Sequence, residues 1–229
     1  MQKKLVRKLD LEMALSQTKP HLTPSPSLEQ YTIPAETAAT MLYIAAYSYQ
    51  NIVGKRVLDL GCGTGRLALG AALLGAKEVV GVDIDKEAVK MAAVNAAKLG
   101  AENVQWVAAD IDAITGRFDT VLQNPPFGVQ KRGADQRFLE RALQLGTMVY
   151  SLHKSTCCDP KVFEALKKRK DETIPVQPSP FLEAFIEAHG GRIGAVYAMA
   201  MTVPHMFTFH SKKKHEFLAD LYIIYKAKQ

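Results

Sequence analysis

The chain has 229 residues, of which 48% are hydrophobic and 23% charged, and its net charge is +6 at pH 7. This length fits one domain with a full core, and the ordinary composition excludes collagen-like and intrinsically disordered classes. The basic charge is compatible with an acidic partner such as nucleic acid, and equally with a mildly basic cytosolic protein.

Targeting and redox signals indicate a cytoplasmic protein. Residues 1–16 mix basic and apolar groups without the apolar core of a signal peptide, and no run of about 18 apolar residues predicts a membrane span. The three cysteines, Cys62, Cys157 and Cys158, form no disulfide framework, so we expect free thiols in a reducing compartment. His153 lies near Cys157, but no second Cys/His cluster completes a metal site, and we expect none.

The amino-terminal part is predicted to be a helix followed by a linker. Residues 2–19 have the apolar spacing of an amphipathic helix, and residues 20–27 contain three prolines. We therefore divide the chain into an appendage over 1–27 and a main domain over 28–229. Pro34 suits a first helical turn and opens an apolar helix to about Tyr49.

From Gly54 onward the chain alternates between strands and helices, which predicts an α/β fold with a mostly parallel sheet. The expected strands are Arg56–Leu60, Glu78–Val82, Val104–Ala108, Phe118–Gln123 and Thr147–Leu152. The expected helices are Arg66–Leu74, Lys86–Leu99, Asp135–Leu145 and Phe181–His189. The stretch of about 156–180 is basic and Pro-rich. In it, Lys161–Leu166 and the basic run 167–170 precede a long loop, which we expect through Pro175, Pro178 and Pro180. Two alternating apolar segments, Gly194–Val203 and Phe217–Tyr225, are expected to pair antiparallel at the sheet edge.

A glycine-rich turn follows the first strand and predicts a bound nucleoside. Gly61, Gly63 and Gly65 stand within five residues between a buried strand and a helix, where they let backbone approach a ligand closely. The last glycine follows the second by two residues rather than three, which disfavours a nicotinamide dehydrogenase.

Three acids at successive strand ends identify the nucleoside. Asp59 would repel a pyrophosphate but pair with an ammonium, Asp83 suits a ribose diol, and Asp110 suits an exocyclic NH2. Each acid alone could be a helix cap or a surface carboxylate. Together they predict S-adenosylmethionine as the cofactor.

Asn124-Pro125-Pro126-Phe127 ends the fourth strand and predicts a site for a planar amine. Two consecutive prolines forbid a helix and remove two backbone donors, which leaves carbonyl acceptors beside an aromatic ring. In open α/β sheets ligands bind at the carboxyl ends of strands. A Pro-rich turn with a capping Asn is the structural alternative.

These motifs resemble those of a known enzyme family. The stretch 59–65 resembles motif I of class I S-adenosylmethionine-dependent methyltransferases, and 124–127 resembles the amino-methyltransferase motif IV. With 30–32, 133–139, 149–154 and 207–214, the chain resembles the archaeal and eukaryotic enzymes that methylate adenine N6 in small-subunit ribosomal RNA. The resemblance implies the class I Rossmann-like fold, with seven strands, mostly parallel, and an antiparallel carboxyl-terminal edge hairpin strand.

The resemblance also implies roles for individual residues. The residues that it implies for cofactor binding are Gln30, Tyr31, Thr32, Asp59, Gly61, Gly63, Thr64, Gly65, Asp83, Ile84, Asp110, Ile111 and Asn124. The catalytic motif is Asn124, Pro125, Pro126 and Phe127, in which Asn124 and the Pro125 carbonyl accept the target N–H bonds and Phe127 stacks on the base. Around the target base and the RNA it places Phe207, Phe209, Lys212, Lys213 and Lys214.

Several questions stay open at this stage. A guanine-N2 or protein-glutamine methyltransferase would share both motifs, and an inert RNA-binding relative would share the fold. Eukaryotic relatives bind a small zinc-containing activator, and Val104–Val107 with Trp106 is the expected edge for one, although Trp106 suits the core equally well.

Overall fold

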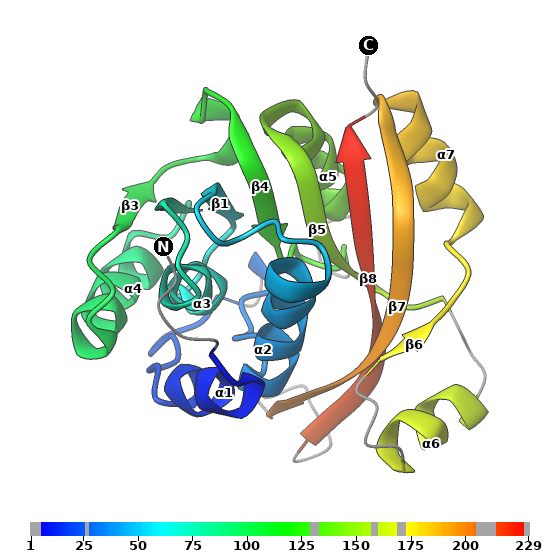
Figure 1. Cartoon of the computed structure of the whole chain (residues 1–229), viewed down its shortest axis with the longest axis horizontal. Coiled ribbons are helices and arrows are strands. Elements are labelled where there is room, and N and C mark those ends of the chain that lie inside the picture. Colours follow the sequence, from blue (N-terminus) through cyan, green and yellow to red (C-terminus); the bar gives the residue numbers. More distant parts are fainter. Residues whose placement is uncertain are drawn as a thin grey trace.

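The computed structural model of the chain describes residues 6–25, 28–128, 133–156, 160–168, 173–204 and 214–226. Within these residues one eight-stranded sheet has the order β3-β2-β1-β4-β5-β8-β7-β6, and it runs from left to right in Figure 1. The strands are β1 Arg56–Leu60, β2 Glu78–Asp83, β3 Val104–Ala108, β4 Phe118–Gln123, β5 Gly146–Lys154, β6 Ile174–Pro175, β7 Gly191–Pro204 and β8 Lys214–Lys226. Strands β1 to β5 pair in parallel, whereas β8 runs antiparallel to β5 and β7, and β6 antiparallel to β7.

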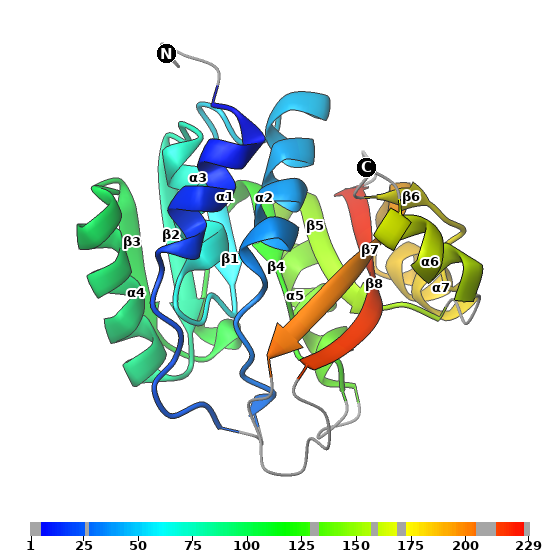
Figure 2. The ribbon, with the colours of Figure 1, turned by 90° about the horizontal axis from the view of Figure 1, so that it is seen from below.

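Helices cover both faces of the sheet. The α-helices are α1 Lys8–Ser16, α2 Ala35–Tyr43, α3 Arg66–Leu73, α4 Lys86–Leu99, α5 Ala134–Leu145, α6 Pro160–Lys168 and α7 Pro180–Ala188. One core cluster joins α1, α2 and α3 to the sheet, and a second joins α5 and α7 to its opposite face. Figure 2 shows α1, α2 and α3 grouped together on their side of the sheet. None of the helices in the described part of the chain is long and apolar enough to cross a membrane.

The predicted α/β architecture is confirmed, with two corrections to the sheet. The described residues form eight strands rather than seven, because Ile174 and Pro175 pair with Ala198 and Tyr197 of β7 inside the stretch interpreted as a loop. A two-residue strand has no alternation that a sequence pattern could reveal. The expected antiparallel pairing of the two carboxyl-terminal segments is confirmed in β7 and β8. However, β8 itself is not an edge strand, since it lies between β5 and β7.

The amino-terminal helix is shorter than the sequence pattern predicts. It begins at Lys8 rather than residue 2, residues 1–5 lie outside the described part, and it ends at Ser16 instead of residue 19. Thr18 turns back to donate its hydroxyl hydrogen bond to the Leu15 carbonyl at 2.7 Å, and the Lys19 amide donates to Asn95 at 2.8 Å. These contacts hold the chain outside the helical path. The second helix likewise changes to a π-helical turn, η2 Ile44–Ser48.

Strand pairing brings the predicted functional residues to one edge of the sheet. β1 is hydrogen-bonded to β2 on one side and to β4 on the other, so that Asp59 lies opposite Gly81 and Leu122. Because parallel strands all end at the same edge, Asp59, Asp83 and Asn124 lie around one crevice.

Candidate active site

The glycine-rich turn between β1 and α3 adopts backbone conformations that only glycine accepts readily. Gly61, Gly63 and Gly65 have φ of 76°, 53° and 89°. The Gly61 amide donates to the Val82 carbonyl at 2.9 Å, which fastens the turn to β2. A Cβ on Gly61 would lie 2.7 Å from Cε1 of Phe138, so the turn and α5 approach each other too closely for a side chain.

Gly65 has a packing role that the sequence analysis did not predict. It does not line the cavity described below, and a Cβ there would lie 2.5 Å from Cη2 of Trp106 and 3.0 Å from Cβ of Ala92. Trp106 also contacts Gly81, where a Cβ would come within 2.5 Å of the ring. Trp106 therefore packs inward from the edge strand β3, which favours the core interpretation of this residue.

Asp59 is a buried carboxylate at the end of β1. The residue is only 1% exposed, and its Oδ2 accepts a hydrogen bond from the Ala68 amide of α3 at 2.8 Å. Burial, with a smaller contribution from the negative charge of Asp83, raises the pKa of Asp59 to about 7. A carboxylate in this position is stabilised by a cation bound beside it.

Asp83 and Asp110 are held by neighbouring backbone and side-chain groups. Asp83 accepts from the Gly63 amide at 2.8 Å and from the Asp85 amide at 2.9 Å, which fixes its carboxylate beside the turn. Asp110 accepts from the Asp112 amide at 2.9 Å and forms an ion pair with Arg137 of α5. A carboxylate can accept several hydrogen bonds at once, which suits the hydroxyl or amine donors of a ligand.

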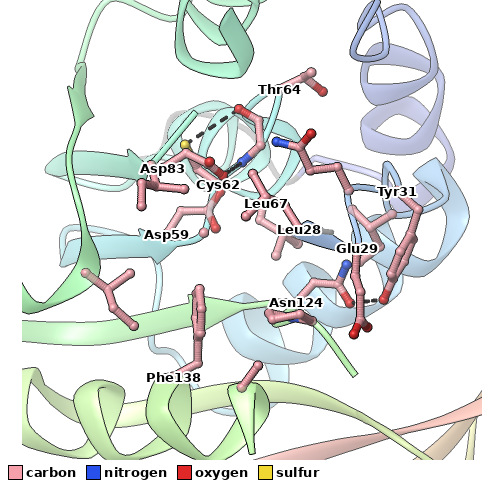
Figure 3. A pocket seen from close by; sticks show the side chains of 18 of the residues that line it. Leu28, Glu29, Tyr31, Asp59, Cys62, Thr64, Leu67, Asp83, Asn124 and Phe138 are labelled. Atoms are coloured by element: carbon pink, nitrogen blue, oxygen red, sulfur yellow. Dashed lines mark hydrogen bonds between the residues drawn. The ribbon is translucent and has the colours of Figure 1, made fainter. Parts of the chain in front are cut away.

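These groups surround a single cavity of about 370 Å³. Figure 3 shows Asp59, Cys62 and Asp83 on the side of the glycine-rich turn, with Glu29, Tyr31 and Asn124 across from them. The residues predicted for the cofactor or the catalytic motif that line it are Gln30, Tyr31, Thr32, Asp59, Gly61, Gly63, Thr64, Asp83, Ile84, Asp110, Ile111, Asn124 and Pro126. Gly65, Pro125 and Phe127 do not line it. Phe207, Phe209, Lys212 and Lys213 lie outside the described residues, and of Lys214 only the backbone, at the start of β8, is described.

Other cavity residues were missed because their roles depend on partners far along the chain. His21 approaches Asp85 with 3.0 Å between Nε2 and Oδ2, and Arg66 binds both the Thr18 hydroxyl and the Ile33 carbonyl. The position of Arg66 directly after the glycine-rich turn is the only sequence signal that could have singled it out. Leu28, Glu29, Cys62, Leu67, Arg137 and Phe138 also line the cavity.

The catalytic motif is held by the segment that precedes α2. The Tyr31 hydroxyl donates to Oδ1 of Asn124 at 2.9 Å, and the Phe127 amide donates to the Glu29 carboxylate at 2.7 Å. The Tyr31 and Phe127 rings have centroids 5.6 Å apart, and Phe127 meets Phe217 edge-on at the same separation. Phe217 of β8 is therefore an aromatic neighbour of the motif that the sequence analysis did not predict.

The cavity fits S-adenosylmethionine. A buried acid whose pKa lies near 7 suits the cofactor's ammonium, and two further carboxylates suit its hydroxyl and amine donors. Half-exposed apolar side chains, Leu28 at 42% and Ile84 at 55%, offer surface for a flat ring. In the described residues no group of three or more His, Cys, Asp or Glu side chains is arranged to hold a metal ion.

Comparison with known proteins agrees with this geometry. Residues 52–174 match the model of a methyltransferase domain. The chain is 36% identical to the uncharacterized protein MJ0284 of Methanocaldococcus jannaschii, over 97% of this chain and 95% of that one. It is 32% identical to the rRNA N(6)-adenosine-methyltransferase METTL5 of Danio rerio, over 92% and 95% of the two chains.

A solved structure with the same fold supports the assignment. PH1948 of Pyrococcus horikoshii, for which RNA methylation is the proposed activity, superposes with a TM-score of 0.81 at 36% identity, over 98% of this chain and 100% of that one. A glycine-rich turn, three strand-end carboxylates and one shared cavity thus coincide with matching sequence and fold. The chain belongs to the methyltransferase domain family and is an S-adenosylmethionine-dependent methyltransferase.

Proposed function

We propose that this enzyme transfers a methyl group to N6 of an adenine in RNA, with small-subunit ribosomal RNA as the substrate. The observation that carries the proposal is that Asp59 and Asn124 line one cavity, so a cofactor ammonium site and an amine-binding motif share a single space. The likeness to rRNA N(6)-adenosine-methyltransferase METTL5 along most of both chains supports adenine as the base.

The cofactor side of the cavity binds and orients S-adenosylmethionine. We assign the ammonium to the Asp59 carboxylate, the ribose hydroxyls to Asp83, and the adenine amine to Asp110. When bound, S-adenosylmethionine supplies an electrophilic methyl group on its sulfonium. The backbone of the turn would lie beside the methionine part, where Gly61 and Gly63 have no side chain to block its approach.

The target side holds a weak nucleophile in a reactive geometry. The lone pair of the adenine amine is delocalised into the ring, so gripping both N–H bonds favours a pyramidal nitrogen whose lone pair is aimed at the methyl group. We assign this grip to Oδ1 of Asn124, which lines the cavity, and to the Pro125 carbonyl, which is assigned from the sequence resemblance alone. Such positioning lowers the barrier without a strong base, and the proton leaves to solvent after transfer.

The substrate must present its base outside the stack. Flipping is cheapest from single-stranded RNA, and stacking of the base on Phe127 contributes roughly 1–3 kcal/mol. We further assign Phe207 and Phe209 to the pocket and Lys212, Lys213 and Lys214 to backbone phosphates. These five contacts follow from the sequence resemblance alone.

Two further proposals concern the cellular setting. β3 is an edge strand of the sheet, and its open side is where we place a small zinc-containing activator. Cys62 is a free thiol, in keeping with action in the reducing cytoplasm.

The direct test is the identity of the methylated product. The protein is incubated with unmodified small-subunit ribosomal RNA and labelled cofactor, with and without a candidate activator, and the RNA is digested to nucleosides. We expect label in N6-methyladenosine. Label in N2-methylguanosine, or only in protein, would refute the adenine assignment.

Asn124→Ala tests the catalytic motif. The substitution removes an acceptor for the target amine while leaving the three carboxylates in place, so we expect methyl transfer to fall by at least about 100-fold. Cofactor affinity, measured by calorimetry, should change by less than about threefold and serves as the control for folding. Normal turnover by this variant would remove Asn124 from the mechanism.

A further inference from the structure

The segment before α2 lines the cavity and also contacts the target motif directly. Glu29 and Tyr31 each bind one end of it: the Glu29 carboxylate accepts from the Phe127 amide at 2.7 Å, and the Tyr31 hydroxyl donates to Oδ1 of Asn124 at 2.9 Å. The second bond joins residues 93 positions apart and is drawn as a dashed line in Figure 3.

The Tyr31 hydroxyl keeps its proton and donates it to Asn124. Burial raises its pKa, so the phenol stays protonated throughout the pH range in which the enzyme would be assayed. A carboxamide oxygen has two lone pairs, and Tyr31 takes one of them. The other remains available for an N–H bond of the target amine.

Without this donor the carboxamide could rotate. A flipped Asn124 would present its NH2 group to the target, and two donors facing each other would repel the amine instead of gripping it. An Asn side chain can bind either way round, so its orientation is decided by the neighbours that its two ends meet. In the structure the Tyr31 hydroxyl meets the oxygen end of the Asn124 side chain.

The segment is held too firmly to be a plug that the substrate displaces. Glu29 has φ of 50°, a conformation costly for a residue with a side chain, and such strain persists only where the surroundings enforce it. The bond to the Phe127 amide supplies part of that enforcement, and the Tyr31 ring packs against Phe127 at 5.6 Å while joining the main core cluster.

We propose that Tyr31 is a positioning residue for methyl transfer: its hydroxyl orients the Asn124 carboxamide so that the oxygen faces the target amine. The inference rests on the proposed amine-methylating function and assigns to Tyr31 a task beyond cofactor contact. It predicts that loss of the hydroxyl slows the chemical step while leaving binding intact.

Tyr31→Phe is the test, because it removes the hydroxyl and keeps the ring against Phe127. In single-turnover assays with ribosomal RNA we expect the rate of transfer to fall about 10- to 100-fold. Cofactor Kd and RNA KM should stay within about threefold of the original. Tyr47→Phe is the matched control, since it removes another partly buried hydroxyl, which is bonded to the Val6 amide at 3.2 Å and does not line the cavity. This variant should leave the rate unchanged.

Repeating the Tyr31→Phe substitution in an Asn124→Asp variant separates orientation of the carboxamide from packing of the ring. A carboxylate accepts whichever way it is turned, so adding Tyr31→Phe to Asn124→Asp should slow transfer by less than about threefold relative to Asn124→Asp alone. An unchanged or faster rate for Tyr31→Phe, or a weaker cofactor Kd that accounts for the whole loss, would overturn the inference. The product formed by the unmodified enzyme tests the proposed function separately, so the two can fail independently.

Discussion

Asp59 shows how the surroundings of one residue can set its chemistry. The carboxylate at the end of β1 is nearly inaccessible to solvent, and one backbone amide is its hydrogen-bond donor from α3. Burial is the larger cause of its high pKa, and the charge of Asp83 adds to it. In the free protein Asp59 is therefore protonated in a large fraction of molecules near neutral pH, and a bound ammonium would favour the ionised form.

This leads to a pH-dependent affinity. Because the pKa of Asp59 is about 7 in the free protein and lower beside an ammonium, cofactor binding releases a proton below pH 7. Affinity should weaken roughly tenfold from pH 7 to pH 5.5, a range in which an α-amino group remains protonated. Calorimetry in buffers of different ionisation enthalpy would detect the proton. Asp59→Asn should bind weakly with little pH dependence, and an equally steep dependence in that variant would contradict the assignment.

The same carboxyl affects stability with the opposite sign. A folded-state pKa above the ordinary value of Asp means that the folded protein binds the proton more tightly than the unfolded chain. Its stabilising contribution is fully present below about pH 4 and is lost as pH rises through 7. Cofactor binding offsets that loss.

Gly65 offers a test of close packing. Gly65→Ala combines a φ of 89° with a Cβ placed 2.5 Å from the Trp106 ring, so we expect the free energy of unfolding to fall by about 2–5 kcal/mol. Gly75→Ala is the matched control: its φ is 92°, but its nearest neighbour, Cγ1 of Val53, is 3.9 Å away. Urea unfolding of both variants isolates the effect of the ring. Equal losses would show that Trp106 moves aside freely.

At the scale of elements, the amino-terminal arm, which is α1 and the chain after it to Lys19, is joined to the glycine-rich turn by the buried side chain of Asn95. Asn95 of α4 is 1% exposed, accepts from the Lys19 amide at 2.8 Å and donates to the carbonyls of Lys19 and Thr64 at 3.1 and 3.0 Å. One side chain therefore joins the chain after α1, the helix α4 and the glycine-rich turn. Arg66 adds a second tie, to Thr18 and Ile33.

Asn95→Ala should loosen both the arm and the turn. It leaves three backbone groups without their partner, so we expect a loss of about 2–4 kcal/mol in the free energy of unfolding and a several-fold weaker cofactor affinity. Asn103→Ala, which removes one bond from an amide to the Ala76 carbonyl at 2.8 Å, is the control and should affect stability less and affinity not at all. Unchanged affinity in Asn95→Ala would separate the arm from cofactor binding.

At the scale of the whole molecule, the packing of α1 can test the predicted boundary between an appendage and the main domain at residue 27. Leu11 and Leu15 of α1 are buried in the same core cluster as Val57, Leu122 and Tyr150 of the sheet. We expect Leu15→Ala to lower the free energy of unfolding of the whole chain by about 2–5 kcal/mol in one cooperative transition. Leu9→Ala, on the same helix but 59% exposed, should change it by less than about 0.5 kcal/mol. A separate early transition would instead support an appendage that unfolds alone.

Much of the fold was predictable because its signals are local. Apolar runs between Gly and Pro residues place β1, β3, β4 and α4 with the bounds that the structure shows, and the strand-end acids line the cavity as expected. β6 was missed because a strand of two residues is too short to show an alternation of apolar and polar side chains. The position of β8 inside the sheet was missed because strand order is a property of pairing and not of sequence pattern.

The sequence by itself determined the class of the protein, an S-adenosylmethionine-dependent methyltransferase, since a glycine-rich turn, three acids and Asn124-Pro125-Pro126-Phe127 are each recognisable within a few residues. The tertiary structure alone decided that Gly65 accommodates Trp106, that Arg137 pairs with Asp110, and that Tyr31 binds Asn124. Each of these contacts joins residues far apart along the chain. Such contacts form only when the sheet brings its strand ends together, which no local pattern encodes.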